Sequence, residues 1–408
     1  MTPHDGLLDE ARDLLDGAIA LRRDLHRHPE LGNHLPDTRN RILEALDGLP
    51  LDVQLHESTS GIAATLTGDT PGPTVLLRAD MDALPMPEDT GVDYSSTVDN
   101  VMHACGHDTH VSMLVGAARL LAARRGDIAG RVLFMFQPGE EGHHGARYML
   151  DEGLLDLPPL PNGDPSPVSG AFAMHITANI PMGMVAGKGG AQMASADTLR
   201  IVVHGRGGHA SEPHRALDPI PIACEIVQAL QSFVTRRLDA FDPGIVTVAR
   251  ITAGTTNNVI PETAEILGTI RAVSERTRST IHDGIRRIAE GIAEAHEGGA
   301  TVEIDQGYPV TVNDPNFADF SLGVGERLLG DRRVLRMPHP IMGAEDFSYV
   351  LNRVQGSMLF LGATPAGVDP QKAPANHSNR VMFDEQAMVT GMAMYTAVAL
   401  DHLGGGTA

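Results

Sequence analysis

Potential metal ligands and an additional carboxylate occur in two short motifs of this chain. The motif MHACGHD places Cys105 and His107 one residue apart, and the motif QPGEEG contains the adjacent pair Glu140 and Glu141. Side chains two positions apart on an extended segment point the same way, so the thiol and the imidazole could bind one ion. Thiolate, imidazole and carboxylate groups are ligands of zinc-like metals, and a carboxylate left free of the metal can accept a proton from activated water. The two motifs therefore indicate metal-assisted hydrolysis.

The segment before the glutamate pair favours a functional role for the pair. Adjacent carboxylates more often form a solvated acidic turn, because they repel each other when no cation is present. Here they follow residues 131–137 (RVLFMFQ), an apolar and β-prone run that predicts a buried strand. Functional sites of α/β proteins lie beyond the carboxyl ends of strands. We therefore expect one glutamate to bind metal and the other to act as general base.

Two later histidines could complete a centre for two ions. His175 ends the segment GAFAMHI, a predicted strand, and His377 lies in a predicted loop with the sequence ANHS. A single histidine is more often an ordinary core or surface residue. A two-metal centre, however, needs more ligands than the first two motifs provide, and these imidazoles could supply them. His103 and His110, near the Cys-Gly-His motif, are expected to have structural or supporting roles.

Three further polar residues occur later in the chain. His209 lies in HGRGGHAS, where glycines allow close approach of the backbone to a ligand. It is either an incidental histidine of a Gly-rich hairpin or an electrophile that reaches the site of another domain. Asn258 in TTNNVIP and Arg271 in GTIR could bind a carboxylate or a carbonyl, although Arg271 alone would be an unremarkable strand residue.

Alternating strands and helices should position the two motifs. Apolar periodicity predicts helices at residues 7–28 and 111–124, and β-prone runs predict strands at 62–66, 74–78 and 170–176. Short turns separate most of these segments. The pattern predicts an α/β fold with a mixed, largely parallel central sheet and helices on both faces.

From about Thr198 the order of predicted elements changes to β-α-β-β-α-β, the ferredoxin-like arrangement. A complete unit of this kind is most simply an inserted α+β domain. We expect a catalytic metal-binding domain at residues 1–190 and 309–408 and an inserted domain at residues 191–308.

Composition excludes several classes of protein. The net charge of −21 and the lack of a basic stripe argue against binding to nucleic acid. Only two cysteines occur, Cys105 and Cys224, in unrelated contexts, which argues against a disulfide framework and fits a reducing compartment. The N-terminal segment lacks the pattern of a secretory signal, and no apolar run reaches the ~20 residues that span a membrane. These features predict a soluble, cytoplasmic protein that has no membrane partner.

Nine motifs in order resemble the signature of a metallopeptidase family. The family includes aminoacylases, hippurate hydrolase, plant indole-acetyl-amino-acid hydrolases and carboxypeptidase G, and the resemblance extends over roughly residues 20–390. The Cys-containing form resembles the branch of N-acyl-amino-acid amidohydrolases. The motifs are RADMDALP, MHACGHD, QPGEEG, HITANIPMG, GRGGHAS, NNVIP, GTIR, MGAEDFSY and NHSNR.

This resemblance assigns roles to the candidate residues. Glu140 matches the general base, which takes a proton from water and passes it to the leaving amine. His209 resembles a histidine that stabilises the oxyanion and that the neighbouring subunit supplies in related dimers. Asn258 resembles a substrate-binding residue, and Arg271 is a weaker candidate for that role. The side chains that match the ligands of two divalent metal ions are Cys105, His107, Glu141, His175 and His377.

One motif departs from the pattern of the peptidase relatives. Where they have a histidine ligand in H-x-D, this chain reads Asp80-Met81-Asp82. The departure fits the Cys branch and gives neither aspartate a role as a ligand.

The resemblance implies a metal-dependent amidohydrolase that cleaves N-acyl amino acids, or short peptide-like amides, to a carboxylic acid and a free amino acid. The alternative on the same scaffold is a dipeptidase, a carboxypeptidase or an N-acyl-diaminopimelate deacylase. A binding protein without catalysis is the more distant alternative, and the presence of Glu140 and every ligand disfavours it. The ions could be manganese, zinc, nickel or cobalt. The inserted domain is expected to act as a lid and to form a homodimer or higher homo-oligomer.

Overall fold

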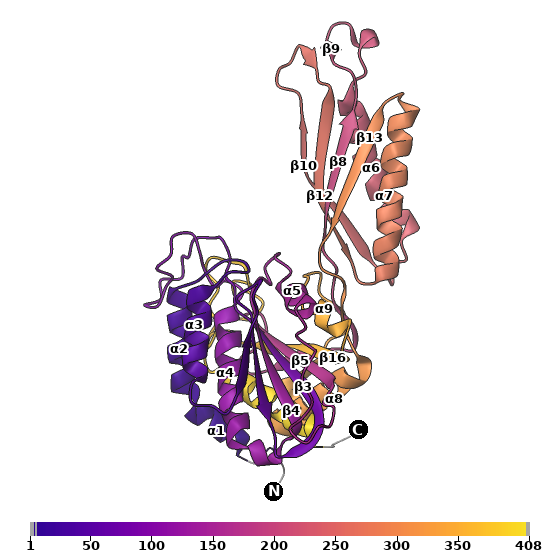
Figure 1. Ribbon diagram of the computed structural model, residues 1–408. Coiled ribbons are helices and arrows are strands. Elements are labelled where there is room, and N and C mark those ends of the chain that lie inside the picture. Colours follow the sequence, from indigo (N-terminus) through magenta and orange to yellow (C-terminus); the bar gives the residue numbers. More distant parts are fainter. Residues whose placement is uncertain (1–3, 5, 405–408) are drawn as a thin grey trace. The chain divides into compact units, whose positions relative to one another are not determined.

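The computed structural model describes residues 4 and 6–404 and divides them into two compact units (Figure 1). The first unit holds the described residues up to Gln192, the segment Val312–His339 and the residues from Tyr349 onward. The second unit holds Met193–Thr311 and Pro340–Ser348.

An eight-stranded sheet forms the centre of the first unit, with the strand order β1-β2-β4-β3-β5-β16-β6-β15. Strand β3 runs parallel to both β4 and β5, and β16 runs parallel to β5, whereas β1 and β2 are antiparallel additions at one edge. The α/β class and the mixed sheet expected from the sequence are therefore confirmed. The five strands that matter most for the site are β2 (Ile62–Thr67), β3 (Thr70–Asp80), β4 (Ala129–Gln137), β5 (Val168–Thr177) and β16 (Gly356–Gly362).

The central strands are apolar because both of their faces are covered. Every residue of β16 is buried, and so is nearly every residue of β4. Helices α4 (His107–Ala123) and α10 (Ala387–Leu403) pack against each other and against β3. The hydroxyl of Tyr395 on α10 donates to the carbonyl of Arg78 and accepts from the amide of Met174, so it ties α10 to β3 and β5.

The carboxyl ends of three neighbouring parallel strands lie together and form the carboxyl edge of this sheet. Asp80, the last residue of β3, pairs with Gln137, the last residue of β4, and Arg78 pairs with Ala173 of β5. The segments that follow β3 and β4 and the end of β5 consequently lie close together. Helix α4 begins at His107, beside the same edge.

The second unit consists of a four-stranded antiparallel sheet with two helices on one face (Figure 1). Its elements follow the expected β-α-β-β-α-β order: β8 (Asp197–His204), α6 (Pro219–Arg237), β10 (Gly244–Ala253), β12 (Thr263–Ala272), α7 (Glu275–Ala295) and β13 (Gly299–Gln306). Buried and exposed residues alternate along β8, as expected for a strand with one face on a core and the other toward solvent.

The remaining elements are short strands, turns and helices. No helix in the described part of the chain has the length and apolar character needed to cross a membrane. The remaining helices are α1 (Leu7–Asp13), α2 (Leu15–Arg27), α3 (Pro36–Leu46), α5 (Gly145–Asp151), α8 (Pro315–Leu329) and α9 (Ser348–Leu351), with 3₁₀ turns at Arg125–Asp127, Pro213–Arg215 and Asp331–Arg333. The remaining strands are β1 (Asp52–Leu55), β6 (Val185–Gly187), β7 (Gly190–Met193), β9 (Gly208–His209), β11 (Val259–Ile260), β14 (Thr311–Asn313) and β15 (Val334–Arg336).

Candidate metal centre

The five side chains predicted to bind metal come together in the first unit. They form two groups in which all the potential ligand atoms lie within 4.8 Å of one another, and Cys105 belongs to both groups. Its Sγ lies 3.4 Å from Nε2 of His175 and 3.3 Å from Nε2 of His377. The first group is Cys105, His107 and His175, and the second is Cys105, Glu141 and His377. The thiol is thus placed to be shared by two ions.

A left-handed glycine brings Cys105 and His107 to the same side. Gly106 has a φ of +86° and precedes the first residue of α4, so the two ligands flank a turn and not the extended segment that the sequence suggested. A Cβ at this position would lie 2.5 Å from Cγ2 of Ile176. Only glycine satisfies both the backbone conformation and the close approach.

Backbone carbonyls orient two of the imidazoles. Nδ1 of His107 lies 2.8 Å from the carbonyl oxygen of Asp82, and Nδ1 of His175 lies 2.8 Å from that of Ile176. Since a carbonyl can only accept, each Nδ1 carries a proton, and in the neutral form of each ring Nε2 has a free lone pair. This is the arrangement typical of metal-binding histidines.

Two of the proposed ligand atoms are buried and have no hydrogen-bond partner. They are Nε2 of His107 and Oε1 of Glu141. Nε2 of His377 approaches that oxygen to 3.2 Å, but the contact lacks the geometry of a hydrogen bond. Unpartnered buried polar atoms are costly and uncommon, so this cluster is better explained by ligands directed at bound cations. The donor set of thiol, imidazoles and carboxylate fits divalent transition metals.

The electrostatics of the cluster favour a cation. Burial, followed by the charges of Glu141, Glu140 and Asp80, raises the pKa of the Cys105 thiol well above its ordinary value. Burial and the neighbouring His110 lower the pKa of His175 to about 3, which keeps this imidazole neutral and able to bind metal. Divalent ions would offset the negative charge and favour the thiolate.

The glutamate pair lies directly beside these ligands. Glu140 is only 6% exposed, and its carboxylate forms a third close group with His107 and Glu141. The turn that carries the pair follows β4 at the carboxyl edge of the sheet, where the sequence predicted it.

Asp82, which the sequence left without a role, holds the glutamate turn. Its carboxylate accepts from the backbone amides of Glu140 and Glu141, at 2.9 and 3.0 Å. Asp82 is 1% exposed and its carbonyl also accepts from His107. One residue therefore restrains both glutamates and one imidazole.

Asp80 supports the centre through its contacts with Arg78 and His110. Its carboxylate contacts Nη1 of Arg78 at 2.6 Å and Nδ1 of His110 at 2.5 Å. His110 in turn accepts from the amide of Ile176 at 2.8 Å, so both its nitrogens are occupied within the protein. This agrees with the supporting role expected for His110. His103 is buried, and neither ring nitrogen has a hydrogen-bond partner.

His209 and Asn258 are neighbours in the second unit. His209 in β9 pairs with Val259 in β11, and the amide of Ala210 donates to the carbonyl of Asn258. Nδ1 of His209 accepts from the amide of Ser211 at 3.2 Å, which leaves Nε2 available as a donor.

Arg271 is not brought to these two residues. Arg271 lies near the end of β12, whereas Thr263 begins that strand. Thr263 pairs with His204, which lies shortly before the loop that carries His209. Eight residues of extended strand correspond to roughly 26 Å. Arg271 is half-buried, and burial lowers its pKa.

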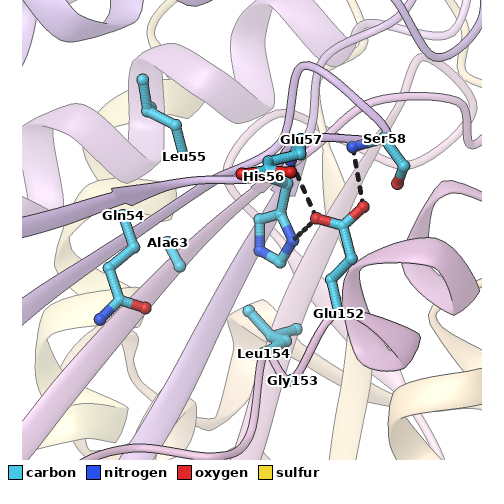
Figure 2. Close-up of a pocket in the computed structure, with 9 residues that line it drawn as sticks. All are labelled: Gln54, Leu55, His56, Glu57, Ser58, Ala63, Glu152, Gly153 and Leu154. Atoms are coloured by element: carbon cyan, nitrogen blue, oxygen red, sulfur yellow. Dashed lines mark hydrogen bonds and ion pairs between the residues drawn. The ribbon is translucent and has the colours of Figure 1, made fainter.

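A cavity of about 660 Å³ occurs elsewhere in the first unit, at the β1 edge of the sheet (Figure 2). Glu152 closes its polar side by accepting from the amides of Glu57 and Ser58, at 2.9 and 2.8 Å, and from Nδ1 of His56. None of the metal-ligand candidates lines this cavity. We assign this cavity a structural role, since the carboxylate of Glu152 already has its hydrogen-bond partners within the protein.

Comparison with known proteins agrees with this chemistry. The model of peptidase family M20/M25/M40 matches residues 76–401. The chain is 37% identical to thermostable carboxypeptidase 1 of Saccharolobus solfataricus, with 97% of each chain covered. It is 36% identical to an N-acetylcysteine deacetylase of Bacillus subtilis, covering 94% of this chain and 96% of the relative. A Bacillus subtilis crystal structure described as a dinuclear metal binding peptidase superposes with a TM-score of 0.81 at 32% identity, covering 96% of this chain and 99% of that one.

Proposed function

Because the chain belongs to peptidase family M20/M25/M40, we propose that it hydrolyses N-acyl amino acids at a centre of two divalent metal ions. It is a metal-dependent hydrolase of amide bonds. The observation that carries the proposal is the pair of three-residue groups that share Cys105. The proposed ligands are Cys105, His107, Glu141, His175 and His377.

The reaction needs a base that the ions do not immobilise. A pair of bound divalent ions supplies acidification of water and polarisation of a substrate carbonyl. Glu140 accepts the proton from that water as it attacks the amide carbon, and delivers it to the amine as the C–N bond breaks. Such a role is typically worth ~10²–10⁴ in rate. Asp82 fixes the peptide of Glu140 and so aims its carboxylate.

Two residues of the second unit are proposed to contact the substrate. We assign donation to the oxyanion to His209, since its Nδ1 is occupied by Ser211 and its Nε2 is free. We assign substrate binding to Asn258, which lies beside His209, with Arg271, at the other end of the same chain's sheet, as the second candidate.

The substrate class is an amide whose leaving group is an amino acid. Similarity to a carboxypeptidase and to a deacetylase is compatible with either an acyl group or a peptide on the other side of the bond. We favour N-acyl amino acids on the resemblance of the Cys-containing motif to that branch. A dipeptidase, a carboxypeptidase or an N-acyl-diaminopimelate deacylase is the alternative.

The other properties proposed are the metal, the assembly and the location. The thiol and the imidazoles favour zinc, nickel or cobalt over hard cations such as calcium, and manganese is proposed on the resemblance to the Cys-containing branch. A homodimer is supported by the exposed apolar side chains of the second unit, including Phe241, which is 96% exposed.

A cytoplasmic location is supported by two free cysteines, Cys105 and Cys224.

The adjacent glutamates provide a matched test. Glu140→Gln should retain two ions per chain and lose turnover by about 10²–10⁴, whereas Glu141→Gln should lose metal as well. Elemental analysis and initial rates on hippurate, N-acetyl amino acids, indole-acetyl conjugates and dipeptides measure both. Wild-type turnover in Glu140→Gln would disprove the assignment of the base, and dipeptides as the best substrates would favour the alternative.

A further inference from the structure

Asn376, the residue before His377, connects the segments that carry three of the proposed ligands. Its Nδ2 donates to the carbonyl of Cys105 at 3.1 Å and to the carbonyl of Ile176, next to His175, at 2.9 Å. The amide of His377 itself donates to the carbonyl of Ala104 at 3.0 Å. These bonds join chain segments that are up to 273 positions apart.

The carbonyl of Ile176 links Asn376 to the imidazole of His175. This oxygen accepts both from Nδ2 of Asn376 and from Nδ1 of His175. Asn376 therefore fixes the group that orients the His175 ring and keeps its Nε2 toward Cys105. The N–H of the same residue donates to Nε2 of His110, so Ile176 is held through both of its backbone polar groups.

The orientation of the Asn376 amide is dictated by its surroundings. Two carbonyls face one end of the side chain, and only the NH₂ group can satisfy both of them. The other end, Oδ1, is buried without a hydrogen-bond partner. The side chain is thus used for its two donors at the expense of its acceptor, which folding stability alone does not favour.

The backbone of the following residue also needs support. His377 has a φ of 68°, in the left-handed region that is unfavourable for a residue with a Cβ. Such conformations persist where surrounding contacts hold them. The bonds of Asn376 and the amide of His377 to the Ala104–Cys105 segment are the contacts that hold this one.

We propose that Asn376 is a positioning residue of the metal centre, whose two N–H donors set the separation of Cys105, His175 and His377 before an ion binds. The proposal rests on the two-metal centre proposed above. The proposed role depends on the two N–H donors of Asn376 and not on the shape of its side chain.

Two variants separate donation from shape. Asn376→Asp keeps the shape but turns an oxygen toward two carbonyls, and Asn376→Ala removes both donors. Each should weaken binding of Mn²⁺ or Zn²⁺ about 10–100-fold, the range found when a group that orients a metal ligand is removed. The measurements are metal titration against a competing chelator, and the rise in unfolding temperature of the metal-free protein when metal is added.

Asn179→Ala is the matched control. Nδ2 of Asn179 also donates to two carbonyls, those of Pro370 and Ala373 at 3.0 Å each, but neither belongs to a residue adjacent to a proposed ligand. The control loses the same number of hydrogen bonds and should bind metal within about threefold of wild type, with the same metal-dependent rise in unfolding temperature.

The outcomes are distinct. Wild-type metal affinity in Asn376→Asp, or an equal loss in Asn179→Ala, would overturn the positioning role while leaving the two-metal centre in place. Absence of metal binding by the wild-type protein would overturn the centre itself, and the positioning role with it.

Discussion

At the scale of single residues, Asp82 shows how a carboxylate can serve a metal site without being a ligand. Both of its oxygens are engaged by the amides of Glu140 and Glu141. A buried carboxylate bound by two N–H groups is a rigid anchor, since each charge-assisted bond is stronger than one between neutral groups. The proposed base and the adjacent ligand thus share one support.

Replacing this anchor should affect catalysis more than folding. Asp82→Asn leaves one acceptor and directs an NH₂ group at a backbone N–H, so we expect the glutamate turn to shift and kcat to fall about 10–100-fold, with lower metal occupancy. Steady-state kinetics and elemental analysis measure both effects. The exposed Asp99→Asn serves as control, and unchanged kcat in Asp82→Asn would refute the role.

The sequence predicted the proposed ligands better than their supports. Cys105, His107 and the glutamate pair form motifs because metal chemistry restricts the residue types that can serve. Asp82 and Asn376 act on backbone groups, which every residue has, so their role depends on which segments meet in space. That information is not present in local spacing.

At the scale of elements, prediction succeeded for short, apolar, β-prone runs bounded by turns. The strands near residues 62–66, 74–78 and 131–137 were found at β2, β3 and β4. Helix α10 was not predicted, because it is apolar on all sides and lacks the amphipathic pattern. The predicted helix over residues 7–28 is two helices, α1 and α2, separated at Leu14.

The turn between β1 and β2 provides an element-scale prediction of pH dependence. Hydrogen bonds from Ser58 and Glu57 lower the pKa of Glu152 from 4.5 to about 2 (Figure 2). A carboxyl group whose pKa is lowered in the folded state stabilises the folded state at pH values above the ordinary pKa. This stabilisation is lost as the pH falls from 4.5 toward 2. Burial also lowers the pKa of His56, so its protonation below its ordinary pKa of 6.5 opposes folding in the same direction.

Glu152→Gln should therefore destabilise the protein at pH 7 and matter progressively less in acid. We expect a loss of about 1 kcal/mol or less at neutral pH, because the carboxylate is partly exposed and solvent screens it. Urea denaturation of wild type and variant at pH 7, 5 and 3.5 measures the difference, with the exposed Glu57→Gln as control. A difference that grows on acidification would contradict the assigned direction.

At the scale of the whole molecule, the second unit has the surface features of an assembly interface. Strand β10 is at the edge of its sheet, and Ile245 and Ile251 on it are 39% and 47% exposed. Phe241 lies just before this strand. Unpaired strand edges with exposed apolar side chains favour pairing with another chain. These features support the proposed homodimer.

Mixing two inactive variants tests whether each subunit supplies His209 to its partner. A dimer of one His209→Ala chain and one Glu140→Gln chain would contain one intact site if the histidine acts between subunits. Random reassociation of equal amounts should then restore about one quarter of wild-type activity, since half of the dimers are mixed and each has one working site. Activity measured after co-refolding gives the answer. No recovery despite mixed dimers would place the histidine in its own subunit's site.

The contact between Cys105 and His377 joins positions 272 residues apart. A ribosome must therefore add 272 residues after Cys105 before both side chains exist. The central strand β16 also comes late in the chain, between β5 and β6 in the sheet. The group of Cys105, Glu141 and His377 is therefore complete only after residue 377 has been added, and a nascent chain released before His377 would be left without one member of its set of proposed ligands.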